Sequence, residues 1–313
     1  MSGPAILIHS DFLAARLPAW NPGGCRIYTQ EDLADGVPAG LAAEVEILVS
    51  GGEPLDNALV DALPRLGLVA CFSTGYAGID AQHLGARGVQ LTTAGGVNAH
   101  DVADHAIALL LAWWHGVPAA DRRVRDGGWR DGLSPRRSLR GRRAGVVGLG
   151  RIGLAVARRL AAHDLDVRWW GPRDKPGAGF ERADSLIALA ERSDILIVTS
   201  RAVPENAGQI DATVLRALGP EGVLVNVSRG FLVNEDSLLE ALADGTLAGA
   251  ALDVFAEEPT DPARWRDLAN VVLSPHLGGY TREAGEDMFG QLGENIRRYL
   301  HGEPLLSPVE DFG

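Results

Sequence analysis

Short runs rich in β-branched and other apolar residues alternate with helical patterns along almost the whole chain, and this alternation most constrains the fold. It is typical of parallel βαβ units, because parallel strands need a crossover connection that is usually a helix. The runs form two series, separated by a helical segment at residues 99–115 that becomes apolar on every side. We therefore expect an α/β protein with two doubly wound parallel-sheet domains.

The two series differ in size. Strands of the first series are expected at residues 5–9, 45–49, 68–72 and 89–92. Strands of the second series are expected at residues 145–147, 166–170, 195–199, 223–227, 249–252 and 271–273. The helical residues 281–301 have no following strand, and we expect them to return to the first domain. The predicted domains are residues 1–97 plus 288–313, and residues 98–287.

Composition and charge narrow the class of protein. The 313 residues include 29 Lys and Arg against 41 Asp and Glu, a net charge of −12 at pH 7 that argues against nucleic-acid binding. The most apolar run, residues 106–114, is far shorter than the roughly 20 residues of a membrane span, and no signal peptide is expected. Cys25 and Cys71 are too few for a disulfide framework or a four-cysteine metal site. We expect a cytoplasmic protein without a metal centre.

A glycine-rich segment follows the first strand of the second series. Residues 148–153, GLGRIG, fit the GxGxxG dinucleotide fingerprint between a short apolar strand and an amphipathic helix. The glycines would allow a tight turn, approach of the backbone to a pyrophosphate, and close packing of helix on strand. A glycine-rich turn without a ligand is the alternative. The predicted cofactor contacts here are Gly148, Gly150, Arg151, Ile152 and Gly153.

The next strand ends at Trp170, where a domain that prefers NAD would place an acid for the ribose hydroxyls. This chain has Gly171 there, followed by Arg173 and Lys175, whose cations suit a 2′-phosphate. We expect NADP to be preferred, with NAD possible. The alternatives are that the two cations belong to a solvated loop, or that Asp174 turns inward and restores binding of NAD.

Six ordered segments carry a family resemblance: residues 72–80 (FSTGYAGID), 101–106 (DVADHA), 148–153 (GLGRIG), 226–230 (NVSRG), 251–259 (ALDVFAEEP) and 274–279 (SPHLGG). With them the chain resembles the D-isomer-specific 2-hydroxyacid dehydrogenases, most closely the hydroxypyruvate/glyoxylate and hydroxyphenylpyruvate reductase branch. The resemblance implies a Rossmann-type cofactor domain, a smaller flavodoxin-like substrate domain and a cleft between them. It also implies hydride transfer from NADPH to a small 2-keto acid, giving the D-2-hydroxy acid, or glycolate in the case of glyoxylate.

The reaction needs a cation for the keto acid, a proton donor and a positioned hydride. Arg229 follows a strand and so lies at a carboxyl end of the sheet, where its planar fork can bind a carboxylate; a buried salt bridge is the alternative. His276 follows another strand, and an imidazole, with an unperturbed pKa of about 6.5, is a suitable proton donor. His9 also follows a strand and competes by position, but the SPHLGG segment selects His276; His100 is the next alternative. The remaining histidines, His105 among them, are interpreted as helix, cap or surface residues.

The resemblance also assigns roles to residues around these two. It pairs His276 with Glu258 rather than Glu257, because the family segment ends in Glu-Pro, and a carboxylate favours the protonated imidazole. Asp253 resembles the residue on the nicotinamide side of the cofactor, with a loop cap as the alternative. Gly278 is expected to contact the cofactor as well.

Substrate binding is expected from loops of the first domain. Ser73-Thr74-Gly75 resembles the family segment whose backbone amides hold the substrate carboxylate, and Gly51 would line the other side. The usual Gly-Val-Gly is Ser-Thr-Gly here, which leaves the identity of the keto acid open. Thr74, Gly75 and Gly51 are the predicted substrate contacts.

Two further expectations concern partners and alternative functions. The apolar residues 106–114 and Trp129 predict a homodimer, although Trp129 could instead be a core residue. The competing functions are an NAD-linked 3-phosphoglycerate dehydrogenase, which needs extra cations for its phosphate, and a non-catalytic dinucleotide-sensing corepressor, which needs no proton donor.

Overall fold

The computed structural model describes residues 3–33 and 36–309. The chain forms two compact units, a smaller one of Met1–Asn98 with Thr281–Gly313 and a larger one of Ala99–Tyr280. The predicted boundary at 287/288 would cut a helix, α11 (Arg282–His301), that is continuous and N-capped by the Thr281 side chain. The structure places this whole helix in the smaller unit, where it packs on strand β4 (Leu68–Cys71).

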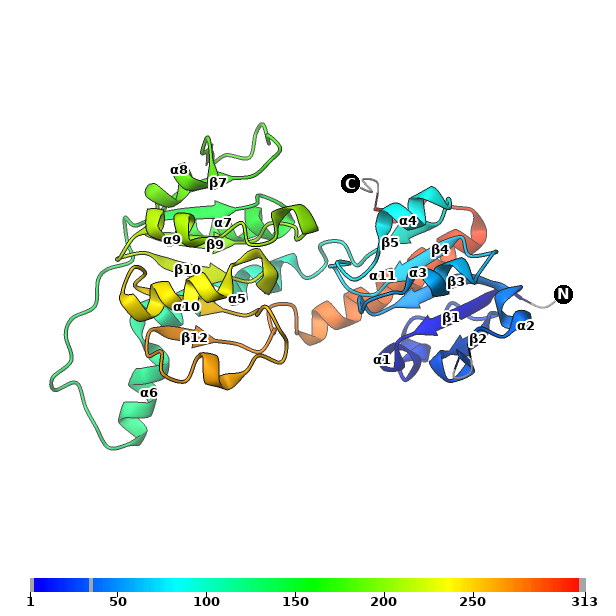
Figure 1. The fold of residues 1–313 in the computed structure, drawn as a ribbon, viewed down its shortest axis with the longest axis horizontal. Helices are drawn as coiled ribbons and strands as arrows, with labels where there is room; N and C mark the ends of the chain where they lie inside the picture. Colours follow the sequence, from blue (N-terminus) through cyan, green and yellow to red (C-terminus); the bar gives the residue numbers. More distant parts are fainter. Residues whose placement is uncertain (1–2, 34–35, 310–313) are drawn as a thin grey trace. The chain divides into compact units, whose positions relative to one another are not determined.

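The smaller unit contains a five-stranded parallel sheet in the order β2-β1-β3-β4-β5 (Figure 1). This is the flavodoxin-like order of a doubly wound sheet. One strand was not predicted, β2 (Arg26–Thr29), which is short and half-buried at the sheet edge and therefore lacks a clear apolar run. The other elements are β1 (Ala5–His9), α1 (Asp11–Ala14), η1 (Leu17–Ala19), η2 (Gln30–Leu33), α2 (Ala39–Ala42), β3 (Val45–Ser50), α3 (Asn57–Asp61), α4 (Ala81–Ala86) and β5 (Gln90–Thr92).

The larger unit contains a seven-stranded parallel sheet in the order β12-β11-β10-β9-β6-β7-β8. The strand that was not predicted, β8 (Glu181–Arg182), has two exposed polar residues, too few to show any periodicity. The other elements are α5 (Ala99–His115), α6 (Val117–Arg125), β6 (Arg143–Val147), α7 (Arg151–Ala162), β7 (Asp166–Trp170), α8 (Leu186–Glu191), β9 (Ile195–Val198), η3 (Pro204–Asn206), α9 (Ala212–Leu218), β10 (Val223–Asn226), η4 (Gly230–Leu232), α10 (Glu235–Asp244), β11 (Gly249–Leu252), η5 (Pro262–Arg264) and β12 (Val271–Leu273). The prediction of two doubly wound parallel sheets is confirmed.

Helices cover both faces of the larger sheet. Successive strand residues point to opposite faces, so Val146 joins a core with α5 and α7 while Val147 joins another with α8, α9 and α10. Helix α5 has the predicted bounds. It buries Val102, Ala106 and Leu110 and packs on α7, β10, β11 and β12.

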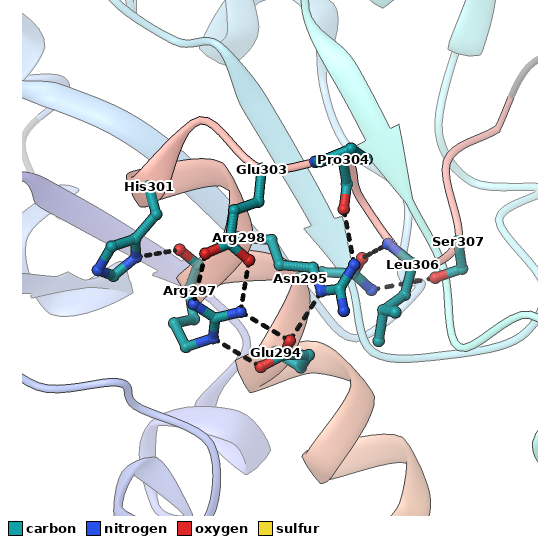
Figure 2. Close-up of polar contacts among 9 residues, drawn as sticks. All are labelled: Glu294, Asn295, Arg297, Arg298, His301, Glu303, Pro304, Leu306 and Ser307. Atoms are coloured by element: carbon teal, nitrogen blue, oxygen red, sulfur yellow. Dashed lines mark hydrogen bonds and ion pairs between the residues drawn. The ribbon is translucent and has the colours of Figure 1, made fainter.

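The C-terminal segment is tied to the smaller unit by polar contacts around α11 (Figure 2). The buried Asn295 donates to the Ser307 hydroxyl at 3.0 Å and accepts from the Leu306 N–H at 2.9 Å. Glu294 accepts from both Arg297 and Arg298, and these hydrogen bonds lower the pKa of its carboxyl to about 2. The segment after α11 is thus held at Leu306 and Ser307 by a buried amide, beside an ionic cluster on the helix.

Candidate active site

Three predicted catalytic residues lie after three adjacent parallel strands. Arg229 follows β10, Glu258 follows β11 and His276 follows β12, and β11 pairs with both neighbours. The carboxyl ends of adjacent parallel strands meet at one edge of a sheet, which is where doubly wound folds bind ligands. The topology therefore brings these residues to one edge of the larger unit.

The loop of Arg229 is held by a buried amide. Asn226, at the end of β10, donates to the Arg229 carbonyl oxygen at 3.0 Å and accepts from the Ser228 N–H at 3.1 Å. The Ser228 hydroxyl donates to the Ser200 carbonyl oxygen at 2.6 Å. A buried side chain that satisfies the turn on both sides gives the loop one conformation. The backbone of Arg229 is therefore fixed.

Close backbone packing joins this loop to the next one. A Cβ at Gly230 would lie 1.8 Å from the carbonyl carbon and oxygen of Phe255, so only glycine fits between the two loops. The Phe255 N–H donates to Glu258 Oε1 at 3.0 Å. Glu258 Oε2 lies 2.7 Å from His276 Nδ1, with the two side chains 36% and 45% exposed. Glu258 and His276 are in direct contact, and Arg229 is connected to them through the backbone of Gly230 and Phe255.

His276 has an unusual backbone conformation. Its φ of 56° lies in the left-handed region, which non-glycine residues adopt rarely. Three successive N–H groups are directed at Asp253: His276 donates to its carbonyl oxygen at 2.9 Å, Leu277 to Oδ1 at 2.8 Å and Gly278 to Oδ2 at 2.8 Å. These bonds offset the cost of the strained residue.

The same contacts bear on two expected cofactor residues. Asp253 is only 1% exposed, and both of its carboxylate oxygens accept hydrogen bonds from the loop of His276. This is the arrangement that the loop-cap alternative predicted. Gly278 is buried, and its N–H is used in that cap. Their contact with a nicotinamide stays a prediction, while their contact with each other is a feature of the fold.

One residue in this network was missed by the sequence analysis. Nε2 of His105, on α5, lies 3.0 Å from Asp253 Oδ1 and 3.0 Å from Ser274 Oγ. His105 lies one helical turn after the buried Val102, so a polar residue beside the apolar face of the helix was the available signal.

The glycine segment fits a dinucleotide. A Cβ added at Gly148 would lie 2.4 Å from Ser200 Cα, and a Cβ added at Gly153 would lie 2.0 Å from the Gly148 carbonyl oxygen. A Cβ added at Gly150 would meet no atom within 4 Å. Gly150 is the N-cap of α7 and no side chain caps that terminus, so an anion can approach its N–H groups. Arg151 begins the helix at an exposed position, and Ile152 packs on the core.

The end of β7 carries more positive charge than the sequence indicated. Gly171 follows the strand, and a Cβ there would meet Trp169 at an ordinary 3.4 Å. Arg173 and Lys175 are exposed in the next loop. Arg182, on the unpredicted β8, donates to the Gly171 carbonyl oxygen at 2.7 Å. A third cation therefore lies at this strand end.

The predicted substrate residues lie on the smaller unit, after β3 and β4. Gly51 follows β3, and its neighbour Gly52 packs so closely on Ser73 that a Cβ would lie 2.3 Å from the serine hydroxyl. Thr74 donates from its hydroxyl to Asn98 Oδ1 at 3.1 Å. Gly75 accepts at its carbonyl oxygen from the Ser73 hydroxyl. These loops place small, half-buried residues at one edge of the sheet.

Among the described residues, 3–33 and 36–309, no helix is long and apolar enough to cross a bilayer. No group of three or more His, Cys, Asp or Glu side chains there could hold a metal ion.

Comparison with known proteins agrees with this geometry. Residues 107–278 match the family model of the D-isomer specific 2-hydroxyacid dehydrogenase NAD binding domain. A hydroxyphenylpyruvate reductase of Plectranthus scutellarioides is 41% identical over 255 residues, 81% of this chain and 82% of that protein. The chain therefore belongs to the D-isomer-specific 2-hydroxyacid dehydrogenase family, as the sequence motifs predicted.

Solved structures narrow the assignment. A 2-hydroxyacid dehydrogenase from Ketogulonicigenium vulgare matches with a TM-score of 0.88 and 36% identity over 99% of both chains. An NADPH-dependent glyoxylate/hydroxypyruvate reductase from Sinorhizobium meliloti, in complex with NADP and malonate, matches with a TM-score of 0.86 and 36% identity over 99% of this chain and 97% of that one. The protein is an enzyme of the reductase branch, a nicotinamide-dependent 2-hydroxyacid dehydrogenase that acts as a 2-keto acid reductase.

Proposed function

We propose that this enzyme reduces hydroxypyruvate or glyoxylate to the D-2-hydroxy acid, or to glycolate, with NADPH as the preferred cofactor. The observation that carries the proposal is the 2.7 Å contact between Glu258 and His276, at the same sheet edge as Arg229. This set supplies the proton donor and the cation that the reduction of a keto acid requires.

When bound, the reduced nicotinamide supplies the hydride that forms the new C–H bond at the carbonyl carbon. His276 Nδ1 is engaged by Glu258, which leaves Nε2 of the imidazolium to donate its proton to the developing alkoxide. The imidazole is then neutral. Glu258 holds the ring in its orientation throughout, as the carboxylate of a catalytic triad does. Arg229 binds the carboxylate or the carbonyl oxygen of the substrate with its planar fork. Backbone amides of Thr74 and Gly75 hold the carboxylate.

The preference for NADPH rests on the charges after β7. Gly171 brings no anion to repel a 2′-phosphate, and Arg173 offers a fork donor two residues later. Arg182, bound to the Gly171 carbonyl, adds a cation beside them. Asp174 accepts from the Lys175 N–H within the loop.

The test is a panel of keto acids with each cofactor. The purified protein is given glyoxylate, hydroxypyruvate, 4-hydroxyphenylpyruvate and 3-phosphohydroxypyruvate with NADPH or NADH, and oxidation of the cofactor is followed by absorbance. The expected result is the highest kcat/KM with glyoxylate or hydroxypyruvate and NADPH. Preference for the phosphorylated acid with NADH would show that the protein is a phosphoglycerate dehydrogenase instead. Binding of the cofactor without turnover of any keto acid would show that it is a dinucleotide sensor.

We also propose that the enzyme is a cytoplasmic homodimer. Figure 1 shows α6 and the segment that follows it extending from the seven-stranded sheet of the larger unit. Val117, Val124, Trp129 and Leu133 on this arm are all more than half exposed, with Trp129 at 66% and so not a core residue. Exposed apolar residues that gather on one segment favour burial by a second copy. Light scattering should return about twice the 33.1 kDa of one chain, and a monomer would contradict this part of the proposal.

A further inference from the structure

A partly buried histidine on α5 connects the two strands that carry the acid–base pair. His105 Nε2 contacts Asp253, which follows β11, and Ser274, which follows β12, at 3.0 Å each. Both partners are buried, and the His105 side chain is 22% exposed. A helix residue thus reaches the ends of both strands beside His276.

Asp253 needs a donor at this position. Its carboxylate is almost completely buried, and an ionised carboxylate is costly to bury unless hydrogen bonds satisfy it. The N–H groups of Leu277 and Gly278 supply two such bonds, one to each oxygen. His105 adds a side-chain donor on Oδ1, the oxygen that also accepts from Leu277. The ring therefore fixes the rotation of the carboxylate that orders the loop.

We propose that His105 is a positioning residue for the acid–base pair. Through Asp253 and Ser274, His105 holds the loop in which His276 adopts its left-handed backbone conformation. It thereby keeps the imidazole of His276 within hydrogen-bond distance of Glu258. A small displacement of a catalytic group can cost a large factor in rate. The inference rests on the proposed function for its effect on turnover, whereas its structural part stands on the contacts alone.

Two variants separate the hydrogen bond from the volume of the ring. His105→Phe keeps a planar ring but removes the donor, and His105→Gln places an amide N–H near the position of Nε2. His115→Phe is the matched control, because His115 is an exposed residue at the end of the same helix.

The first measurement does not depend on activity. Amide hydrogen exchange at Leu277 and Gly278, followed by NMR, reports the bonds to Asp253 directly. Exchange should be about tenfold faster in His105→Phe and near the wild-type rate in His105→Gln and His115→Phe. Unchanged exchange in His105→Phe would overturn the inference.

The second measurement is kinetic, with the best keto acid found for the wild type. In His105→Phe, kcat should fall about tenfold or more with KM almost unchanged, and His105→Gln should recover most of it. The solvent isotope effect on kcat should rise in His105→Phe, because proton transfer becomes slower. Faster exchange with normal kcat would show a structural role only and overturn the positioning role. A wild type inactive on every keto acid would refute the proposed function, and the exchange result would still decide the contact.

Discussion

The carboxyl edges of the two sheets are built differently. In the larger unit, Arg229, Glu258 and His276 project from loops fixed by the buried side chains of Asn226 and Asp253. In the smaller unit, the loops after β3 and β4 present glycine, serine and threonine around main-chain groups. Proton transfer needs particular side chains held in place, whereas a carboxylate can be bound by backbone N–H groups, which every residue except proline has. Substitutions should therefore be far more costly at the first edge than at the second.

The largest effect is expected for His276→Ala. Loss of the proton donor should lower kcat by about 10²–10⁴-fold, since general acid catalysis contributes that much. NADPH affinity, measured by fluorescence titration, should stay close to wild type because the glycine segment of α7 is untouched. His115→Ala is the control. Near wild-type kcat in His276→Ala would refute the assignment of His276 as the proton donor, and His9 and His100 would have to be reconsidered.

Arg229→Lys tests whether geometry matters beyond charge. A lysine is a point cation and cannot reproduce bidentate binding of a carboxylate, so kcat/KM should fall about ten- to a hundredfold. Steady-state kinetics with Arg216→Lys, an exposed position on α9, gives the control for the substitution itself. If the two variants behave alike, Arg229 has no role in binding the substrate.

Arg173→Ala tests the cofactor contacts at the end of β7. One charge-assisted contact is worth about ten- to a hundredfold, so KM for NADPH should rise by that factor while KM for NADH barely changes. Gly171→Asp, whose Cβ would meet Trp169 at an ordinary 3.4 Å, should invert the preference. An effect of Arg173→Ala on both cofactors alike, or a wild type that prefers NADH, would contradict the charge argument.

At the other edge, Thr74→Val should have a small effect. It removes one neutral hydrogen bond to Asn98 and keeps the backbone amide, so KM for the keto acid should rise only about two- to tenfold. Thr74→Ser, which keeps the hydroxyl, should be closer still to wild type. A loss of kcat comparable to that of His276→Ala would erase the difference between the two edges.

The smallest effect concerns stability, at a residue that belongs to neither set of loops. The hydrogen bonds from Arg297 and Arg298 lower the pKa of Glu294 to about 2 from an ordinary 4.5, so its contribution is present above about pH 4.5 and is lost as pH falls toward 2. Glu294→Gln should lower the urea midpoint slightly at pH 6 and less at pH 3.5. Glu286→Gln, exposed on the same helix, is the control. A difference from wild type that grows as the pH falls would have the wrong sign.

Prediction from sequence succeeded where a pattern was long or a motif was ordered. The helix at residues 99–115 and the family were predicted, because a 17-residue apolar helix and six ordered segments are strong signals. Strands β2 and β8 were missed, because β2 has four half-buried residues, β8 has two exposed ones, and neither has an apolar run. Arg182 was missed along with β8.

The sequence by itself determined the class of fold, most of the strands along the chain and the residue types available for chemistry, since apolar periodicity and motif order are local along the chain. Only the tertiary structure decided how those residues are held. Asp253 and Ser274 lie 148 and 169 residues beyond His105, and no local pattern relates them. Their contact depends on α5 packing along β11 and β12, which is a property of the folded unit.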